Sequence, residues 1–212
     1  HIIVAEYDND RIQILELGGN YITKFGSTGT GNGQFINPYG VAVNSTNHIF
    51  VSEYSNHRVQ IFDSNGSFLG KFGSFGTGNG QFINPTGIDV NGSAIIVSDE
   101  SNNRIQIFDL SGNFLGKFGS SGSLDGEFSS PSGVAFDNTG RIIVSDKNNN
   151  RIQIFDSSGN FITKFGSSGS GNGQFSSPHH ISVDSANHII VADQANHRIQ
   201  IFDQSGKYLQ KV

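Results

Sequence analysis

The sequence contains no cysteine, so it forms no disulfide bond and offers no thiolate ligand to a metal ion. This absence leaves the redox compartment open, and we favour an extracellular or cell-surface location over the cytoplasm. No stretch approaches the roughly 18 apolar residues that a membrane helix needs, and no signal peptide is visible. We therefore expect no membrane contact, although a chain that begins at His1 rather than Met could have lost a targeting segment.

Charged residues are also scarce, at 15% of the chain, and the net charge of -5 argues against a general affinity for nucleic acid. Phenylalanine is the abundant apolar residue, with 18 copies, so much of the core must be aromatic. No segment has a convincing helical period. Together with plentiful glycine, asparagine and serine, these features indicate an all-β protein of many short strands joined by tight turns.

The sequence repeats itself along its whole length. A glycine-rich segment, GTGNGQF in its first two copies, begins at Gly29, Gly76, Gly122 and Gly169. A strand typified by RIQIFD begins at Arg11, Arg58, Arg104, Arg151 and Arg198, so the period is 46 or 47 residues. A phosphate-binding glycine loop would open a helix, but each of these segments leads through a proline into another strand. They are therefore interpreted as connectors.

Four strand-like segments recur in each period, and Asn-Gly or Ser-Gly turns separate the third from the fourth. Four antiparallel strands in about 47 residues are typical of a propeller blade. We predict a single β-propeller domain over residues 1–212. Its blades are expected at approximately 1–27, 35–74, 82–120, 128–167 and 175–212.

The first unit begins directly at its second strand, so the first blade should lack its inner strand. The expected inner strands of the other blades are Gly40–Val43, Gly87–Val90, Gly133–Phe136 and His180–Val183. Three arrangements remain open: a closed five-bladed ring, part of a larger propeller, or open edges that pair with another chain. We favour the five-bladed ring, and expect either a monomer or self-association through the open blade edges.

The repeated motifs resemble the NHL repeat family. The resemblance rests on PxGVAV, on IxVSD/E or IxVAD/E, on NHRVQIF at Asn56–Phe62 and on GSFLGKFG at Gly66–Gly73, and it covers essentially the whole chain. It implies a β-propeller, most often six-bladed, that serves chiefly as a binding platform. Some relatives are enzymes, notably the lyase of peptide amidation, in which histidines from different blades converge on a metal, and some animal relatives bind RNA.

An acidic residue stands five positions before each repeated arginine, across the turn between the second and third strands. The pairs are Glu6/Arg11, Glu53/Arg58, Asp99/Arg104, Asp146/Arg151 and Asp193/Arg198. Such a carboxylate–guanidinium pair can be bidentate and would pin the turn. An asparagine two residues before each arginine tolerates left-handed backbone and can bond its own turn, so we expect its role to be local geometry. Because active sites are usually unique, fivefold repetition indicates a structural clamp rather than catalytic groups.

Most basic residues are committed to the repeat. Besides the five arginines, one lysine per unit lies on the fourth strand, where it would protect an outer edge: Lys24, Lys71, Lys117, Lys164 and Lys211. Only three cations remain free, too few for the cluster that a phosphate backbone requires. RNA binding is therefore not expected, despite the family precedent.

Irregular positions near the channel mouth offer the best candidates for ligand binding. One set follows the acid of the second strand, and the other lies between the proline and the residue that opens the inner strand. These positions are Tyr7, Tyr54, Glu100, Lys147 and Gln194, and then Tyr39, Thr86, Ser132 and His179, with His180 as its neighbour. Aromatic, hydroxyl and charged groups of this kind suit a peptide or glycan site. The alternative is that they are unselected solvent-facing loop residues.

His179 and His180 raise the question of a metal site. A catalytic zinc needs about three protein ligands, and the matching positions of the other units hold no histidine. We therefore expect neither a metal nor a cofactor, and we identify no catalytic residue. The favoured function is a non-enzymatic module that presents top-face loops to a peptide, protein or glycan. A metal-assisted lyase or hydrolase at the channel mouth, or a structural or engineered repeat unit without a ligand, is the alternative.

Overall fold

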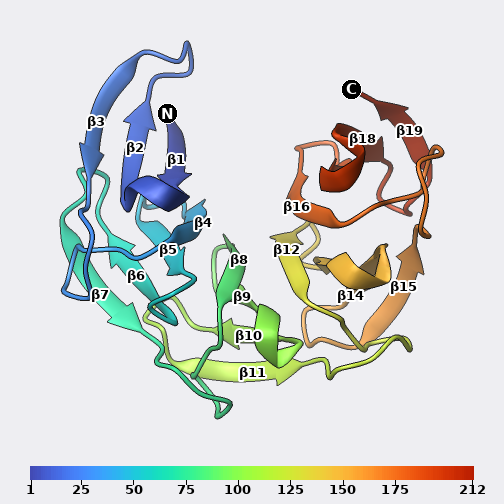
Figure 1. Ribbon diagram of the computed structural model, residues 1–212, viewed down its shortest axis with the longest axis horizontal. Helices are drawn as coiled ribbons and strands as arrows, with labels where there is room; N and C mark the ends of the chain where they lie inside the picture. Colours follow the sequence, from blue (N-terminus) through green and yellow to red (C-terminus); the bar gives the residue numbers. More distant parts are fainter.

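The computed structural model describes all 212 residues as an all-β propeller with five blades (Figure 1). The first blade is a three-stranded sheet and the other four are four-stranded, and all strand neighbours within a blade are antiparallel. The first two blades contain β1 (Ile2–Glu6), β2 (Arg11–Leu15) and β3 (Tyr21–Phe25), then β4 (Pro38–Val43), β5 (Ile49–Glu53), β6 (Arg58–Phe62) and β7 (Phe68–Phe72). The predicted NHL-type architecture, including the missing inner strand of the first blade, is confirmed.

The remaining blades repeat the same arrangement. The third blade contains β8 (Pro85–Val90), β9 (Ile95–Asp99), β10 (Arg104–Phe108) and β11 (Phe114–Phe118). The fourth contains β12 (Pro131–Phe136), β13 (Ile142–Asp146), β14 (Arg151–Phe155) and β15 (Phe161–Phe165). The fifth contains β16 (Pro178–Val183), β17 (Ile189–Asp193), β18 (Arg198–Phe202) and β19 (Tyr208–Lys211). Each inner strand begins at its proline, two residues before the predicted start.

Short turns fix the register within each blade. Glu53 on β5 lies directly opposite Arg58 on β6, and the acid–arginine pairs of the other blades share this register. The left-handed residue of this turn is the one immediately before the arginine, such as His57 with φ 54°. The asparagine one position earlier does not use the left-handed conformation that it tolerates. It does bond its own turn, as expected, because Asn56 Nδ2 donates to the carboxylate of Glu53.

Phenylalanine fills the spaces between consecutive blades, as the composition predicts. Phe72 of the second blade lies 4.7 Å from Phe108 of the third, measured between ring centroids, and Phe82 of the intervening connector lies 5.5 Å from Phe108. All but Phe72 are fully buried. The same three-ring contact recurs at each blade junction, so aromatic packing joins every blade to the next.

The blades form an open arc, and the predicted closed ring of five blades is wrong. The first and last blades face each other across an opening, with β1 on one side and β16 on the other (Figure 1). Inner strands pack in the order β1, β4, β8, β12, β16. Each blade packs on the next one along the chain, and the turn made by five blades packed in this way leaves the first and the last apart.

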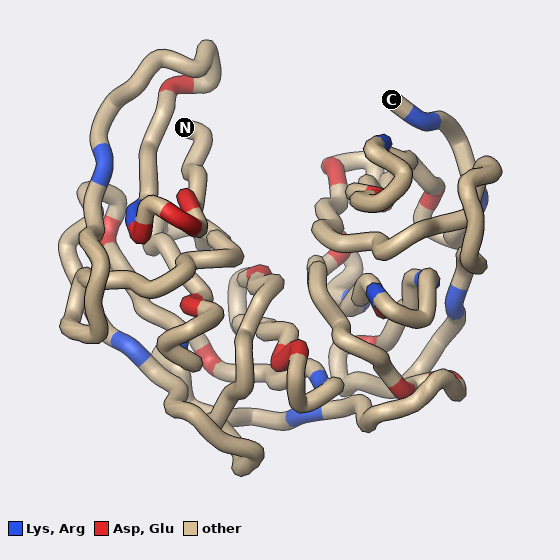
Figure 2. The backbone as a smooth tube through the Cα atoms, in the orientation of Figure 1, with Lys and Arg blue, Asp and Glu red and all other residues tan.

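The outer strands carry the lysines, as expected, and these lie along the outer side of the arc (Figure 2). Helical structure is limited to four 3-10 turns of three residues each: η1 (Tyr7–Asn9), η2 (Glu100–Asn102), η3 (Lys147–Asn149) and η4 (Gln194–Asn196). No helix in the chain has the length and apolar character needed to cross a membrane.

Candidate functional site

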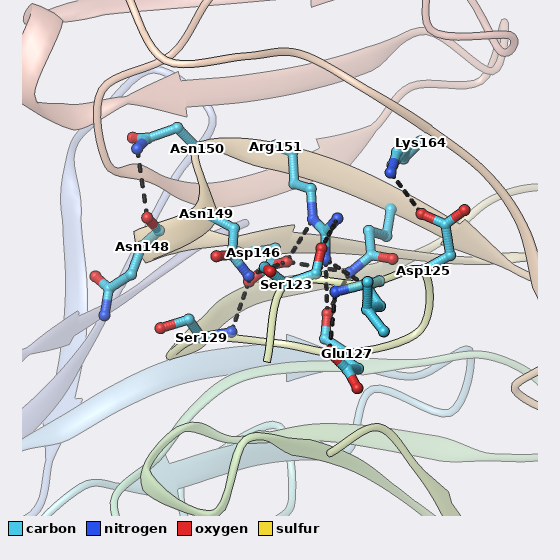
Figure 3. A network of polar contacts seen from close by, with 12 residues as sticks. Ser123, Asp125, Glu127, Ser129, Asp146, Asn148, Asn149, Asn150, Arg151 and Lys164 are labelled. Atoms are coloured by element: carbon cyan, nitrogen blue, oxygen red, sulfur yellow. Dashed lines mark hydrogen bonds and ion pairs between the residues drawn. The ribbon is translucent and has the colours of Figure 1, made fainter. Parts of the chain in front are cut away.

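The repeated acid–arginine pairs belong to a larger hydrogen-bond network, which Figure 3 shows in the fourth blade. Arg151 Nε donates to Asp146 at 2.7 Å. The two terminal nitrogens of Arg151 donate to backbone carbonyls of the connector that arrives from the third blade, those of Ser123, Leu124 and Glu127, at 2.7–2.9 Å. The contact to the carboxylate is thus made through Nε, and the fork of the guanidinium holds the connector.

We call this arrangement the connector anchor. It consists of the acid, the asparagine, the arginine and the glutamine of one blade, in the fourth blade Asp146, Asn149, Arg151 and Gln153. The acids of the second to fifth blades have no exposed surface. Since no ligand can reach a carboxylate enclosed in this way, the chemistry of these acids is the fixing of turns and connectors.

Three tyrosines gather where the first two blades meet the central channel. Tyr7 begins η1, Tyr54 follows β5, and Tyr39 is the second residue of β4. The ring centroid of Tyr7 lies 5.8 Å from that of Tyr39 and 6.2 Å from that of Tyr54, while Tyr39 and Tyr54 are stacked at 6.1 Å. Tyr7 and Tyr54, which follow the second strands of their blades, therefore lie at the same rim of the channel as Tyr39 on the inner strand β4.

Two histidines of the fifth blade meet this cluster from the other side of the channel. The Tyr39 hydroxyl lies 2.6 Å from Nε2 of His179, and Nδ1 of His179 lies 3.0 Å from Nδ1 of His180. The ring of His180 stacks on Tyr39 with 5.6 Å between centroids and an interplanar angle of 12°. Tyr39, His179 and His180 thus form a continuous hydrogen-bonded aromatic group.

Partial burial favours the neutral forms of this group. It raises the pKa of Tyr39 to about 12, an effect to which the negative charge of Glu100 adds. Burial also lowers the pKa of His179 to about 4, helped by repulsion from His180 and Lys147. At neutral pH, the Tyr39 hydroxyl can therefore donate a hydrogen bond to Nε2 of His179. In that arrangement His179 donates from Nδ1 to His180, whose Nε2–H remains available to a ligand.

The far part of the rim carries an ion pair. Lys147 Nζ lies 3.5 Å from a carboxylate oxygen of Glu100. Burial raises the pKa of Glu100, while the charge of Lys147 acts in the opposite direction.

Two of the other predicted ligand-binding positions are enclosed, because Thr86 and Ser132 are fully buried. Those two side chains cannot touch a ligand at the channel mouth.

A cavity of about 760 Å³ lies beside the aromatic group in the central channel, and residues of every blade line it. Of the predicted residues, Tyr7, Tyr39, His179, His180 and Gln194 line it. Most of the remaining lining is apolar, and it includes Ile3, Val4, Ile181 and Ala192, which the sequence alone did not single out. The strand pattern of the sequence predicts that these apolar residues are buried in the core. In the open arc they border the cavity instead.

The position of His180 explains why this blade departs from the repeat. A Cβ atom at the equivalent Gly40 would lie 2.6 Å from the carbonyl oxygen of Thr86 on the next inner strand. No inner strand packs on that side of β16 in this structure, so a large side chain fits there.

No group of three or more histidine, aspartate or glutamate side chains lies close enough to hold a metal ion. The residues present therefore do not fit the convergent metal site of the amidating lyases.

Two family models match parts of the chain. One, described as the NHL repeat, matches residues 35–62, and another, described as a 6-bladed beta-propeller, matches residues 123–212. The chain is a β-propeller that contains an NHL repeat. Among curated proteins, none matches the sequence.

Solved structures that resemble this NHL propeller share its fold at low sequence identity. A Bacteroides caccae protein of unknown function has a TM-score of 0.68 at 13% identity over 99% of this chain and 71% of its own. Virginiamycin B lyase from Staphylococcus aureus has a TM-score of 0.69 at 16% identity, over 99% of this chain and 65% of its own. A chain of a nidogen/laminin complex gives 0.69 at 14% identity, over 99% and 78%. The NHL propeller therefore spans about two thirds of the lyase.

Proposed function

We propose that this NHL propeller is a non-enzymatic binding module, and that it takes a peptide, protein or glycan at the channel mouth. The observation that carries the proposal is the convergence of Tyr7, Tyr39 and Tyr54 with His179 and His180 beside a cavity of about 760 Å³. Aromatic side chains supply large contact areas at small entropic cost, and a few polar groups among them orient a ligand.

The irregularity of these positions supports this proposal. The anchor residues recur in every blade and are occupied with holding the fold, whereas the rim residues differ from blade to blade. Tyr7 remains 38% exposed although it packs against two other tyrosines. A nidogen/laminin complex among the similar structures is in keeping with protein recognition by such a propeller.

Screening of the purified chain against a displayed peptide library and a glycan array tests the proposal. A binder should be retained by the wild type and lost on Tyr7→Ala or Tyr54→Ala. Tyr21→Ala is the matched control, because Tyr21 lies on β3 of the first blade, is 58% exposed and is remote from the rim cluster. Binders that none of the rim substitutions weakens, or that Tyr21→Ala weakens equally, would contradict the assignment.

A second candidate is a lyase that acts at the same cavity. It is favoured by the hydrogen-bonded group of Tyr39, His179 and His180 beside the cavity, in which Nε2–H of His180 is available to a substrate. Among the similar structures, a catalytically inactive histidine-to-alanine variant of virginiamycin B lyase was solved with quinupristin. Conversion of quinupristin by this chain, followed by mass spectrometry and abolished by His179→Ala, would establish the lyase in place of the binding module.

A further inference from the structure

The side of the first blade that faces the opening differs from its equivalents in exposure, although its residues are of the same type. Ile2 and Val4 on β1 are 40% and 36% exposed. Ile49 and Val51, at the same positions of β5, are 1% and 0% exposed, because the preceding blade packs against them. The apolar face of the first blade is therefore suited to pack against a preceding blade, as the equivalent faces of the other blades do.

In the four other blades, polar contacts with the connector accompany this apolar packing. In each of them, the arginine of the connector anchor donates to three carbonyl oxygens of the connector that arrives from the preceding blade. The distances are 2.6–2.9 Å for Arg58, 2.7–2.8 Å for Arg104, 2.7–2.9 Å for Arg151 and 2.7 Å for Arg198. The bound group is thus backbone rather than side chain (Figure 3).

The glutamine of each anchor completes the recognition of this backbone. Gln60 donates from Nε2 to the carbonyl of Gln34 at 2.8 Å, and its Oε1 accepts the N–H of Gly33 at 2.9 Å. Gly33 has φ 75°, a conformation that favours glycine. Phe35, which ends the connector, is fully buried against Phe62. The chemistry of the occupant is therefore a glycine-rich segment with a terminal phenylalanine.

The first blade has the same four anchor residues without an occupant. Arg11 Nε donates to Glu6 at 2.8 Å, and Asn9 and Gln13 also donate to Glu6. The terminal nitrogens of Arg11 donate to no acceptor, Oε1 of Gln13 receives no donor, and the side chain of Arg11 is 33% exposed, against 8% for Arg151. Leu15 takes the place of Phe62 as the apolar partner. The anchor of the first blade is therefore already assembled around Glu6.

We propose that this anchor, with Arg11 and Gln13 as its donors and acceptor, binds a glycine-rich connector of another NHL-type blade. The occupant carries the pattern Gly-x-Gly-x-Gly-Gln-Phe followed by a strand that pairs with β1. A second copy of this chain does not fit, because all four of its connectors already occupy anchors of their own. The anchor uses other side chains than the rim cluster, but the strand that follows the connector would lie along β1, whose Ile3 and Val4 also line the cavity of the proposed function.

A synthetic peptide with the sequence of Lys24–Val43 contains both parts of the occupant and tests the proposal. Isothermal titration of the folded chain with this peptide should give saturable binding at one site. Arg11→Ala should weaken it by about tenfold or more, since hydrogen bonds from a charged donor are removed. Arg11→Lys should weaken it as well, because an ammonium group cannot reproduce the fork of the guanidinium.

Three controls make the result specific. Lys71→Ala removes an exposed positive charge of the second blade and should leave binding unchanged. A peptide with alanine in place of the glycine equivalent to Gly33 should bind more weakly. Circular dichroism should show that both Arg11 variants remain folded, because the side chain of Arg11 bonds only to Glu6.

Two results would overturn the proposal. One is the absence of saturable binding by the wild type, or binding that both Arg11 variants retain in full. The other is a dimer of the free chain, detected by analytical ultracentrifugation, that Arg11→Ala converts to monomer, since a second copy would then be the occupant.

Discussion

The hydroxyl of Tyr39 and Nε2 of His179 lie 2.6 Å apart, although 140 residues separate them in the sequence. The two residues are the second residues of the inner strands β4 and β16, in the second and fifth blades, so their hydrogen bond crosses the channel directly. Consecutive blades are joined by aromatic packing, whereas these two blades are joined by polar and stacking contacts at the rim. The same pair therefore shapes the candidate site and restrains the open arc.

Removal of this hydroxyl should destabilise the chain modestly. We expect Tyr39→Phe to lower the free energy of unfolding by about 1 kcal/mol, which is the usual net value of one hydrogen bond. Urea denaturation measures the change, and Tyr21→Phe, whose hydroxyl lies on an exposed residue of β3, is the control. Equal stability of Tyr39→Phe and the wild type would show that the contact contributes nothing to the fold.

His179 should make the stability of the chain depend on pH in the acid range. Its pKa is about 4 in the folded chain, below the ordinary value of 6.5, because burial and neighbouring positive charge disfavour the imidazolium. Between these pH values the unfolded chain takes up a proton that the folded chain does not. The stabilisation is therefore complete above about pH 6.5 and is lost as the pH falls toward 4.

The thermal midpoint, followed by circular dichroism from pH 7 to pH 4, measures this dependence. His179→Gln should flatten the decline, while the contributions of the carboxylates and of His180 remain in both proteins. A decline of the same steepness in His179→Gln would show that His179 titrates normally in the folded chain.

The repeat made most of the fold predictable. Each blade is specified by local features: strand alternation, a glycine with positive φ at the turn before the outer strand, such as Gly66 at 84°, and the acid opposite its arginine. Because these features act within about 47 residues and recur, the four-stranded units and the channel-facing rim followed from the sequence. The fork contacts of Arg151 with the connector did not, since carbonyl acceptors carry no sequence signal.

Closure of the arc and the composition of the cavity were not predictable in the same way. The angle between two blades depends on how phenylalanines such as Phe72, Phe82 and Phe108 pack together, and a small error in that angle accumulates over five blades. The burial of Thr86 and Ser132 follows from the same packing, which brings inner strands too close for a ligand to enter. Contacts between distant blades, such as Tyr39 with His179, depend on this geometry.

The close approach of inner strands gives a prediction with an internal control. Gly40→Ala would place a methyl group 2.6 Å from the carbonyl oxygen of Thr86, so β4 and β8 would have to separate. We expect a loss of about 2 kcal/mol in the free energy of unfolding, within the usual range for overpacking. Gly70→Ala, on the outer strand β7, meets no atom within 4 Å and should change stability by less than about 1 kcal/mol. Equal effects of the two substitutions in urea denaturation would contradict the packing argument.

The connector anchors give the largest expected difference between two chemically identical substitutions. Arg151→Ala would leave the buried carboxylate of Asp146 without its ion pair and three connector carbonyls without a donor. Breaking a buried ion pair in this way costs about 3–5 kcal/mol. Arg11→Ala removes the same side chain from an anchor that holds no connector, where Arg11 bonds to Glu6 alone. Its effect on the free energy of unfolding should be far smaller, because water screens an ion pair that it can reach. Urea denaturation of both variants measures the difference, and similar losses of stability would mean that Arg11 is held as firmly as Arg151.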